Sequence, residues 1–197
     1  MKSALREVLE TALLAALVFL ILQTSVQNFR VEGSSMDPTL ASGEHLLVNK
    51  AVYMRINVEP LSRVFPSLRN REGFRVYPFH PPRQGDIVVF RFPLDPSRDF
   101  VKRVMAGPGD TVEIRQGTVI VNGKPLSEPY VRHPSPWTAL PRRLGENEYY
   151  VLGDNRGASN DSRDWGPVPL NNIIGKAWVI YWPFDRLDAF LASSWLR

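Results

Sequence analysis

Residues 85–110 of this chain read GDIVVFRFPLDPSRDFVKRVMAGPGD, and two segments within them decide the fold. The first, residues 86–92, follows a glycine, has a continuous apolar centre and stops at Pro93. The second, residues 100–105, ends just before a Gly-Pro-Gly turn. Short segments rich in valine, isoleucine and phenylalanine that are bounded by glycine and proline are typical of β-strands. Both segments are therefore predicted strands.

The same pattern recurs along the rest of the chain and predicts a mainly β protein. Residues 111–121 form a predicted hairpin, because two alternating strands flank a turn that contains Gly117. Short strands at this spacing, separated by turns rich in glycine and proline, are typical of all-β domains. The further predicted strands are residues 45–48, 111–114, 118–121, 148–152 and 177–182.

Two proline-containing stretches interrupt this pattern, and the C-terminus departs from it. Residues 54–84 contain five prolines and several arginines, so we expect a long surface excursion there. Residues 131–144 are expected to form a second excursion. In the tail, residues 186–197, apolar side chains recur at helical spacing. They predict either a helix packed on the sheet or a helix lying at a membrane interface.

The N-terminal region is different, because the 19 residues 11–29 carry no charged side chain. As a helix they would extend about 28 Å, close to the ~30 Å hydrocarbon core of a bilayer. A cleaved signal peptide and a buried core helix are the alternatives, but no A-x-A-like cleavage site follows. We therefore predict a retained transmembrane signal anchor. Lys2 and Arg6 precede it, so the positive-inside rule places residues 1–10 in the cytoplasm and residues 30–197 outside.

Composition excludes several classes of function. Without cysteine, the chain cannot form disulfides, zinc–cysteine sites or a cysteine nucleophile. Its 24 basic and 20 acidic residues leave a net charge of +4 without a run of like charges, which argues against nucleic acid as a partner. The histidines, His45, His80 and His133, lack metal-ligand spacing, and no phosphate- or dinucleotide-binding motif occurs. We therefore expect neither a metal nor a cofactor.

Three polar strings carry groups that can perform chemistry. GSSMDPTL, residues 33–40, is a Gly-Ser turn that would expose a hydroxyl shortly after the anchor. FVKRVMAGPGD, residues 100–110, places Lys102 beside aromatic and apolar residues, where burial would lower its pKa. GDNRGASNDSRDWG, residues 153–166, is a polar loop whose aspartates and arginines could form ion pairs. Taken singly, these strings also fit a Ser-rich linker, a surface lysine and a solvated turn.

Together and in this order, the strings resemble the bacterial type I signal peptidases, a family of membrane-anchored Ser/Lys endopeptidases. The similarity covers nearly the whole chain: an N-terminal anchor, Ser-Met-x-Pro-Thr-Leu, Gly-Asp-Ile-Val-Val-Phe, Lys-Arg-Val-Met-Ala-Gly-Pro-Gly-Asp and Gly-Asp-Asn-Arg-x-x-Ser-x-Asp-Ser-Arg. The resemblance implies a signal-peptidase-like, all-β catalytic domain over residues 30–197, preceded by one transmembrane helix. It also implies cleavage of N-terminal signal peptides from exported preproteins after small residues, in the pattern Ala-x-Ala.

The resemblance implies a role for each matching site residue. Ser35 is similar to the nucleophile of the family and Lys102 to its general base. A serine hydroxyl needs a base to take its proton, and a neutral lysine can do so. Ser159 matches the serine that orients this lysine, and Asp161 and Arg163 match an ion pair that braces the loop.

The resemblance also implies how substrate is held. Some family members carry a serine for the oxyanion hole two residues before the nucleophile, where this chain has Gly33, as other branches do. The implied partners are preprotein signal peptides and membrane lipid, with the catalytic domain on the extracytoplasmic side of the cell membrane. We expect the substrate to add as an extended strand against an edge of the enzyme. The residues that match the lining of the small substrate pockets are Phe29, Val31, Met36, Leu40 and Val101.

Two other functions fit parts of the sequence. One is a self-cleaving regulatory protease that also uses a Ser/Lys pair, although the anchor and the lack of a DNA-binding module weigh against it. The other is a membrane-anchored, non-catalytic β-domain that binds exported proteins. A binding domain of that kind would not need Ser35, Lys102 and Ser159 together.

Overall fold

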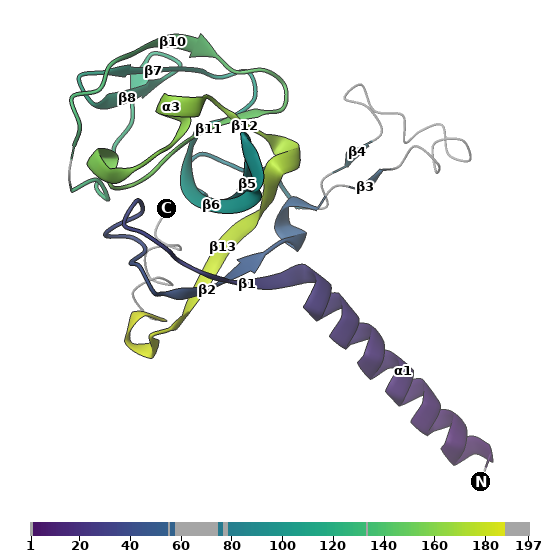
Figure 1. Cartoon of the computed structure of the whole chain (residues 1–197). Coiled ribbons are helices and arrows are strands. Elements are labelled where there is room, and N and C mark those ends of the chain that lie inside the picture. Colours follow the sequence, from purple (N-terminus) through teal and green to yellow (C-terminus); the bar gives the residue numbers. More distant parts are fainter. Residues whose placement is uncertain (1, 55, 58–74, 77–78, 133, 188–197) are drawn as a thin grey trace.

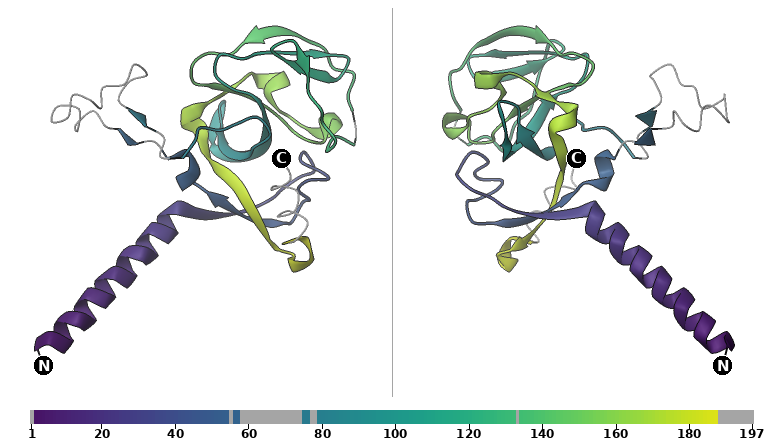
Figure 2. Two further views of the ribbon diagram at one scale, coloured as in Figure 1. Left: turned by 180° about the vertical axis from the view of Figure 1, so that it is seen from behind. Right: turned by 45° about the vertical axis from the view of Figure 1, so that its right-hand side comes forward.

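A computed structural model describes residues 2–54, 56–57, 75–76, 79–132 and 134–187 of the 197-residue chain. The fold is mainly β, with one long helix at the N-terminus, which confirms the predicted fold class (Figure 1). The helix extends away from the β body. A four-stranded sheet, which includes the strands labelled β7, β8 and β10, lies at the end of the body remote from the helix (Figures 1 and 2).

Helix α1, Lys2–Ser25, is long and apolar enough to cross a membrane between Arg6 and Ser25. Its apolar side chains, such as Leu13 and Phe19, are exposed rather than packed on the body. The helix ends four residues before the predicted end of the anchor. The chain changes there to strand β1, Val26–Arg30, because these residues pair with strand β2, His45–Asn49.

Seven antiparallel strands form the larger sheet, in the order β1-β2-β13-β5-β6-β11-β12. The two segments that open the sequence analysis are its neighbouring central strands β5 and β6, with Val88 opposite Lys102 and Val89 opposite Val101. Strand β6 begins at Asp95, five residues before the predicted strand. The bounds not yet given are β5 Ile87–Phe92, β6 Asp95–Ala106, β11 Glu148–Leu152, β12 Val168–Pro169 and β13 Ile173–Trp182.

The continuous apolar run of strand β5 has a structural reason, because the strand is buried on both faces. Alternation along the strand sends Ile87 and Val89 into one hydrophobic cluster, together with residues of β2 and β13. It sends Val88 and Phe90 into a second cluster, on the other face, with residues of β11 and β12. The site described below therefore rests on a strand that is packed from both sides.

A four-stranded sheet, in the order β10-β7-β8-β9, packs on the far part of the larger one. Its bounds are β7 Thr111–Arg115, β8 Thr118–Val121, β9 Lys124–Pro125 and β10 Ala139–Arg143. The prediction of a surface excursion over residues 131–144 was wrong at its end, where β10 pairs with β7. The sequence ALPRR has no apolar alternation, and its proline is tolerated because β10 is an edge strand.

Short turns complete the described chain. Single turns of helix are η1 Ala51–Tyr53, η3 Arg156–Ala158, α3 Ser162–Trp165, η4 Leu170–Asn172 and η5 Phe184–Arg186. Within the predicted excursion at residues 54–84, the two-residue strands β3, Ile56–Asn57, and β4, Arg75–Val76, pair with each other. Residues 58–74 of this excursion, and residues 188–197 of the predicted C-terminal helix, lie outside the described residues.

Candidate active site

Ser35 and Lys102 are 67 positions apart in the sequence and meet beside strand β6 of the larger sheet. Lys102 Nζ donates a hydrogen bond to Ser35 Oγ at 2.7 Å and another to the Val101 carbonyl at 2.9 Å. Strand β6 carries the lysine, and its pairing with β5 fixes the position of the lysine backbone. The structure thus brings together a hydroxyl and an amine within direct proton-transfer distance.

The turn that presents Ser35 begins at a glycine and ends in the core. Gly33 has a φ of +82°, a left-handed backbone conformation that residues other than glycine rarely adopt. Nothing lies within 4 Å of the position a Cβ would take there, so the backbone conformation, not space, favours glycine. After the serine, Met36 and Leu40 are buried and anchor the turn in the hydrophobic cluster around β2 and β5.

The environment of Lys102 favours its neutral form. The residue is 4% exposed, and burial lowers the pKa of its amine to about 8, although the charges of Asp161 and Asp154 act in the opposite direction. Its Nζ also lies 5.4 Å from the centre of the Phe100 ring. With this pKa, about a tenth of the lysine is neutral at pH 7 and about half at pH 8. A free lysine, with a pKa near 10.4, is almost fully charged at both pH values.

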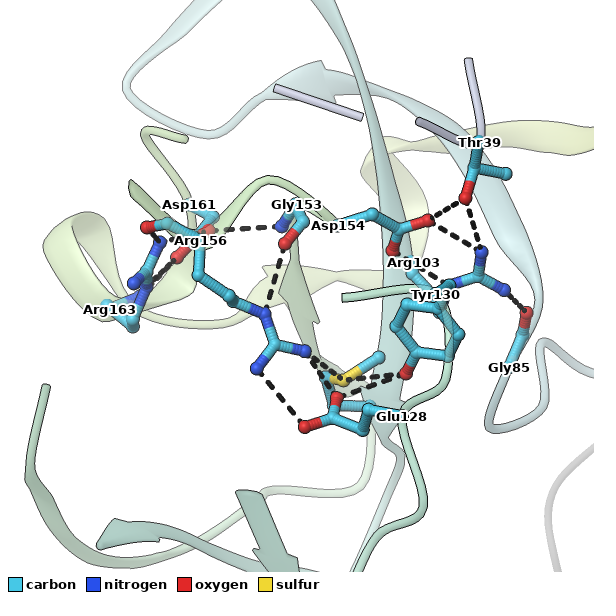
Figure 3. Close-up of polar contacts among 11 residues, drawn as sticks. Thr39, Gly85, Arg103, Glu128, Tyr130, Gly153, Asp154, Arg156, Asp161 and Arg163 are labelled. Atoms are coloured by element: carbon cyan, nitrogen blue, oxygen red, sulfur yellow. Dashed lines mark hydrogen bonds and ion pairs between the residues drawn. The ribbon is translucent and has the colours of Figure 1, made fainter. Parts of the chain in front are cut away.

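Each of the two buried aspartates near the lysine is engaged by its own arginine (Figure 3). Asp154 accepts hydrogen bonds from Arg103 at 2.8 and 2.7 Å. Asp161 accepts them from Arg163 at 2.7 and 2.9 Å, which is the predicted ion pair. An adjacent guanidinium offsets much of the field that each carboxylate exerts on a third group. The amine of Lys102 is thus not held as an ammonium by a carboxylate of its own.

The loop after β11 packs directly on the backbone of the serine. The Asn155 N–H donates to the Ser35 carbonyl at 3.0 Å, and Asn155 Nδ2 donates to the Ser34 carbonyl at 3.2 Å. A Cβ at Gly153 would collide with both the Ser35 carbonyl and the side chain of Ser159. The approach of the loop to Ser35 therefore requires glycine at position 153.

Asp161 also organises the loop through its backbone. It caps the short helix α3, accepting from the Arg163 N–H, while the side chain of Asp164 accepts from the Asp161 N–H. Its Oδ2 accepts from the Gly153 N–H at 3.0 Å. One carboxylate thus links both ends of the loop, a contribution that the expected ion pair alone does not include.

Ser159 does not make the expected hydrogen bond to Lys102. Its Oγ is buried and has no hydrogen-bond partner in the described part of the chain, and the lysine donates to Ser35 and Val101 instead. The side chain nevertheless lies beside Gly153, in the segment that packs on Ser35. The sequence located this serine near the site without determining its hydrogen bond.

A cavity of about 620 Å³ opens beside the serine and the lysine. Three of the predicted pocket residues, Phe29, Val31 and Val101, line it. Met36 and Leu40 do not; both lie in the hydrophobic core behind it. Leu46 of β2 and Val89 of β5 line it instead, and sequence reasoning missed them. The sequence predicted both strands, but it did not show which strands would face the serine.

Two open backbone edges border this cavity. Strand β1 is the terminal strand of the larger sheet. Strand β11 pairs with β6 from Arg103 to Ala106, so in the described chain residues 99–102 of β6 pair with β5 alone. Open edges offer unpaired N–H and C=O groups to which an extended peptide can add. The arrangement suits a peptide that lies along the cavity with its backbone against the enzyme.

The histidines lie away from this centre where they are described. His45 packs against Tyr181, and His80 packs against Tyr53. His133 lies outside the described residues. Within the described chain, no three acidic or histidine side chains are grouped as metal ligands.

Comparison with known proteins gives consistent matches. The family model for signal peptidase, peptidase S26, matches residues 5–182. The signal peptidase I of Leptolyngbya laminosa is 37% identical over 194 residues, which cover 94% of this chain and 83% of that protein. The probable signal peptidase I-1 of Synechocystis sp. is 34% identical over 190 residues, with coverages of 92% and 85%. A crystal structure of a signal peptidase I from Enterococcus faecalis is 31% identical, covers 50% of this chain and 98% of its own, and superposes with a TM-score of 0.45.

The buried environment of Lys102 predicts a directly measurable titration. In full-length protein with ¹³C-labelled lysine side chains, one Cε resonance should titrate with a midpoint near pH 8, because burial destabilises the ammonium. The Lys102→Met variant identifies that resonance by its disappearance. A midpoint for Lys102 close to 10.4, the value of a free lysine, would contradict the proposed desolvation.

Proposed function

The chain belongs to the signal peptidase family, peptidase S26, and from this premise we propose which of its residues perform the cleavage. Members are serine endopeptidases, and this chain acts on the signal peptides of preproteins. We assign Ser35 as the nucleophile and Lys102 as the general base. The observation that carries this assignment is the 2.7 Å contact between the serine hydroxyl and a buried lysine whose pKa is about 8.

The proposed reaction follows from that contact. When Lys102 is neutral, the Ser35 hydroxyl donates its proton to Nζ as Oγ attacks the carbonyl carbon of the scissile bond. The resulting ammonium then gives this proton to the leaving amine, and an acyl-enzyme remains on Ser35. The neutral lysine next takes a proton from a water molecule as the water oxygen attacks the ester carbonyl. The ammonium returns this proton to Ser35 Oγ as the ester bond breaks, which releases the signal peptide and restores the serine hydroxyl and the neutral lysine. No further ionisable group is required.

Two features around the serine support stabilisation of the oxyanion and positioning of the lysine. We assign the Ser35 backbone N–H as one donor to the oxyanion, with Gly33 shaping the turn on which it lies. Asp161 and Arg163 keep the loop at residues 153–163 against the serine. Ser159, which this loop carries next to Gly153, supports the site by packing.

We further propose that the cavity holds the residues that precede the scissile bond. Val31, Leu46, Val89 and Val101 form an apolar part of its wall, which would receive the alanine side chains of an Ala-x-Ala sequence. The substrate backbone would pair with the open edges of β1 and β6. Both edges lie at the cavity that contains Ser35.

The domain organisation follows from the same proposal. Residues 30–197 would form the catalytic domain on the extracytoplasmic side, and α1 would anchor it in the cell membrane. The length and hydropathy of α1 support the anchor. Lys2 and Arg6, at the N-terminal end of α1 and ahead of its apolar part, support an N-terminus in the cytoplasm.

Substitutions at the proposed dyad should separate a lysine base from a histidine base. Ser35→Ala and Lys102→Met should each abolish cleavage of a preprotein by detergent-solubilised protein, since loss of a general base typically costs about 10²–10⁴ in rate. Lys102→Arg should be equally inactive, because a guanidinium does not deprotonate in proteins. With the wild-type chain, kcat/KM should rise with pH around a midpoint near 8, since the active neutral amine forms above its pKa.

The matched control is His45→Gln, which changes an ionisable residue outside the site. It should keep both the rate and the basic limb of the pH profile. Near-normal activity of Lys102→Arg, or loss of the limb in His45→Gln, would rule out the Ser/Lys assignment. A wild-type chain that binds preproteins without cleaving them would instead favour a non-catalytic binding domain.

The apolar part of the cavity wall predicts selection at the residue before the scissile bond. A preprotein with alanine there should be cleaved, and its leucine counterpart should lose at least about 10²-fold in kcat/KM, because each extra methylene is worth about 1–3 kcal/mol. Val31→Ala shortens a side chain of the wall and so enlarges the cavity. It should reduce the difference in kcat/KM between the alanine and the leucine substrate. Equal cleavage of the two substrates by the wild-type chain would refute the small pocket.

The proposed orientation can be measured in whole cells. Protease added to intact spheroplasts should degrade the chain beyond residue 30 and leave the N-terminal segment with the membrane, because the β body lies outside. A cytoplasmic marker protein should stay intact in the same sample. Full protection of the β body would reverse the orientation.

A further inference from the structure

Besides Arg163, the loop that packs on Ser35 contains a second arginine, Arg156, whose partner comes from a distant segment (Figure 3). Its side chain is 4% exposed and forms an ion pair with Glu128, whose side chain is 11% exposed. Arg156 Nη2 donates to Glu128 Oε1, and Nη1 donates to Oε2 at 3.2 Å. This is a two-pronged contact between almost completely buried charges, the geometry in which arginine and carboxylate interact most strongly.

Glu128 does not belong to the loop or to the larger sheet. It lies in the connection that leaves β9 of the smaller sheet, before β10 begins. In this connection, Tyr130 donates to Glu128 Oε1 at 3.0 Å, and its ring lies 3.9 Å from the guanidinium carbon of Arg103. The same short segment therefore contacts Arg156 and also Arg103, the partner of Asp154.

Arg156 transmits this contact to the backbone next to the serine. Its Nε donates to the Gly153 carbonyl at 3.1 Å, and its own carbonyl accepts from Arg163 at 2.9 Å. Gly153 lies against the Ser35 carbonyl, where even a Cβ has no room. A displacement of Arg156 would therefore move Gly153, which lies directly against the backbone of Ser35.

We propose that Glu128 is a positioning residue for the reaction: it holds Arg156, which holds Gly153 against Ser35. The smaller sheet then has a role in catalysis, because its outgoing segment supplies the carboxylate that places the loop. This assignment rests on the proposed function of Ser35 and Lys102. Glu128 contacts neither of these two residues, so its effect on the reaction is one of geometry.

Replacement of the carboxylate tests the proposal in the full-length chain. Glu128→Gln should lower kcat about 10²-fold with KM changed less than about twofold, because a displacement near 1 Å at reacting groups costs about that factor in rate. Glu128→Asp, which keeps the charge, should recover part of the loss. The matched control is Glu146→Gln, the same chemical change at an exposed position, and it should behave as wild type.

A double variant separates positioning from stability. Glu128→Gln leaves Arg156 as a buried charge without its partner, which destabilises a protein. In Glu128→Gln with Arg156→Gln that charge is absent, so the thermal unfolding midpoint should return toward wild type, whereas kcat should stay low because the contact to Gly153 is lost. Recovery of kcat together with the midpoint would show that the pair contributes stability alone and would overturn the proposal. The double variant decides the matter even if Glu128→Gln fails to fold.

Hydrogen exchange gives a readout that does not depend on activity. The Gly153 and Asn155 amides, which donate to Asp161 and Ser35, should exchange at least about tenfold faster in the double variant than in Glu146→Gln. Unchanged exchange and unchanged kcat, with a wild-type chain that cleaves and a Ser35→Ala variant that does not, would reject Glu128 while the proposed function stands. A wild-type chain that cleaves nothing would reject the proposed function, and the exchange rates would still decide whether Glu128 holds the loop.

Discussion

A lysine that works as a base must lose its proton near neutral pH, and this requires an environment that is poor in water and not dominated by negative charge. Lys102 meets both conditions in different ways. Burial beside Phe100 and the Ser35 turn removes water, and the pKa falls to about 8. The two aspartates that oppose this shift are each paired with an arginine, so neither is the lysine's own counter-ion.

This constraint explains why so many charged residues without a proposed part in bond making surround the candidate active site. Asp154 and Asp161 are needed to hold backbone and side chains of the loop and the Ser35 turn in place. Thr39, in that turn, donates to Asp154 at 2.5 Å, and the Gly153 N–H donates to Asp161. Buried carboxylates in these positions are tolerated because each has a guanidinium beside it. The arginines thus allow structural carboxylates close to a lysine that has to become neutral.

The arrangement of the sheets gives the site its support. Strand β5 is packed on both faces and holds β6, which carries Lys102 on an otherwise open edge. The smaller sheet packs beyond the point where β11 joins β6, and its outgoing segment returns to the loop through Glu128. Rigid elements thus hold the reacting groups from behind, and the front remains open to an extended peptide.

The sequence by itself determined the mainly β fold and the apolar N-terminal helix, and it singled out Ser35, Lys102 and the Asp161–Arg163 pair as candidates, because these depend on local patterns and short motifs. Only the tertiary structure decided that Leu46 and Val89 line the cavity. It also decided that the hydroxyl of Ser159 lacks a hydrogen-bond partner among the described residues, and that residues with little strand pattern form β10. It alone paired Glu128 with Arg156, 28 positions away. The physical reason is that strand pairing, burial and ion pairing are contacts between segments distant in sequence. A residue's own neighbours set its conformational preference, but they do not specify which distant surface it will face.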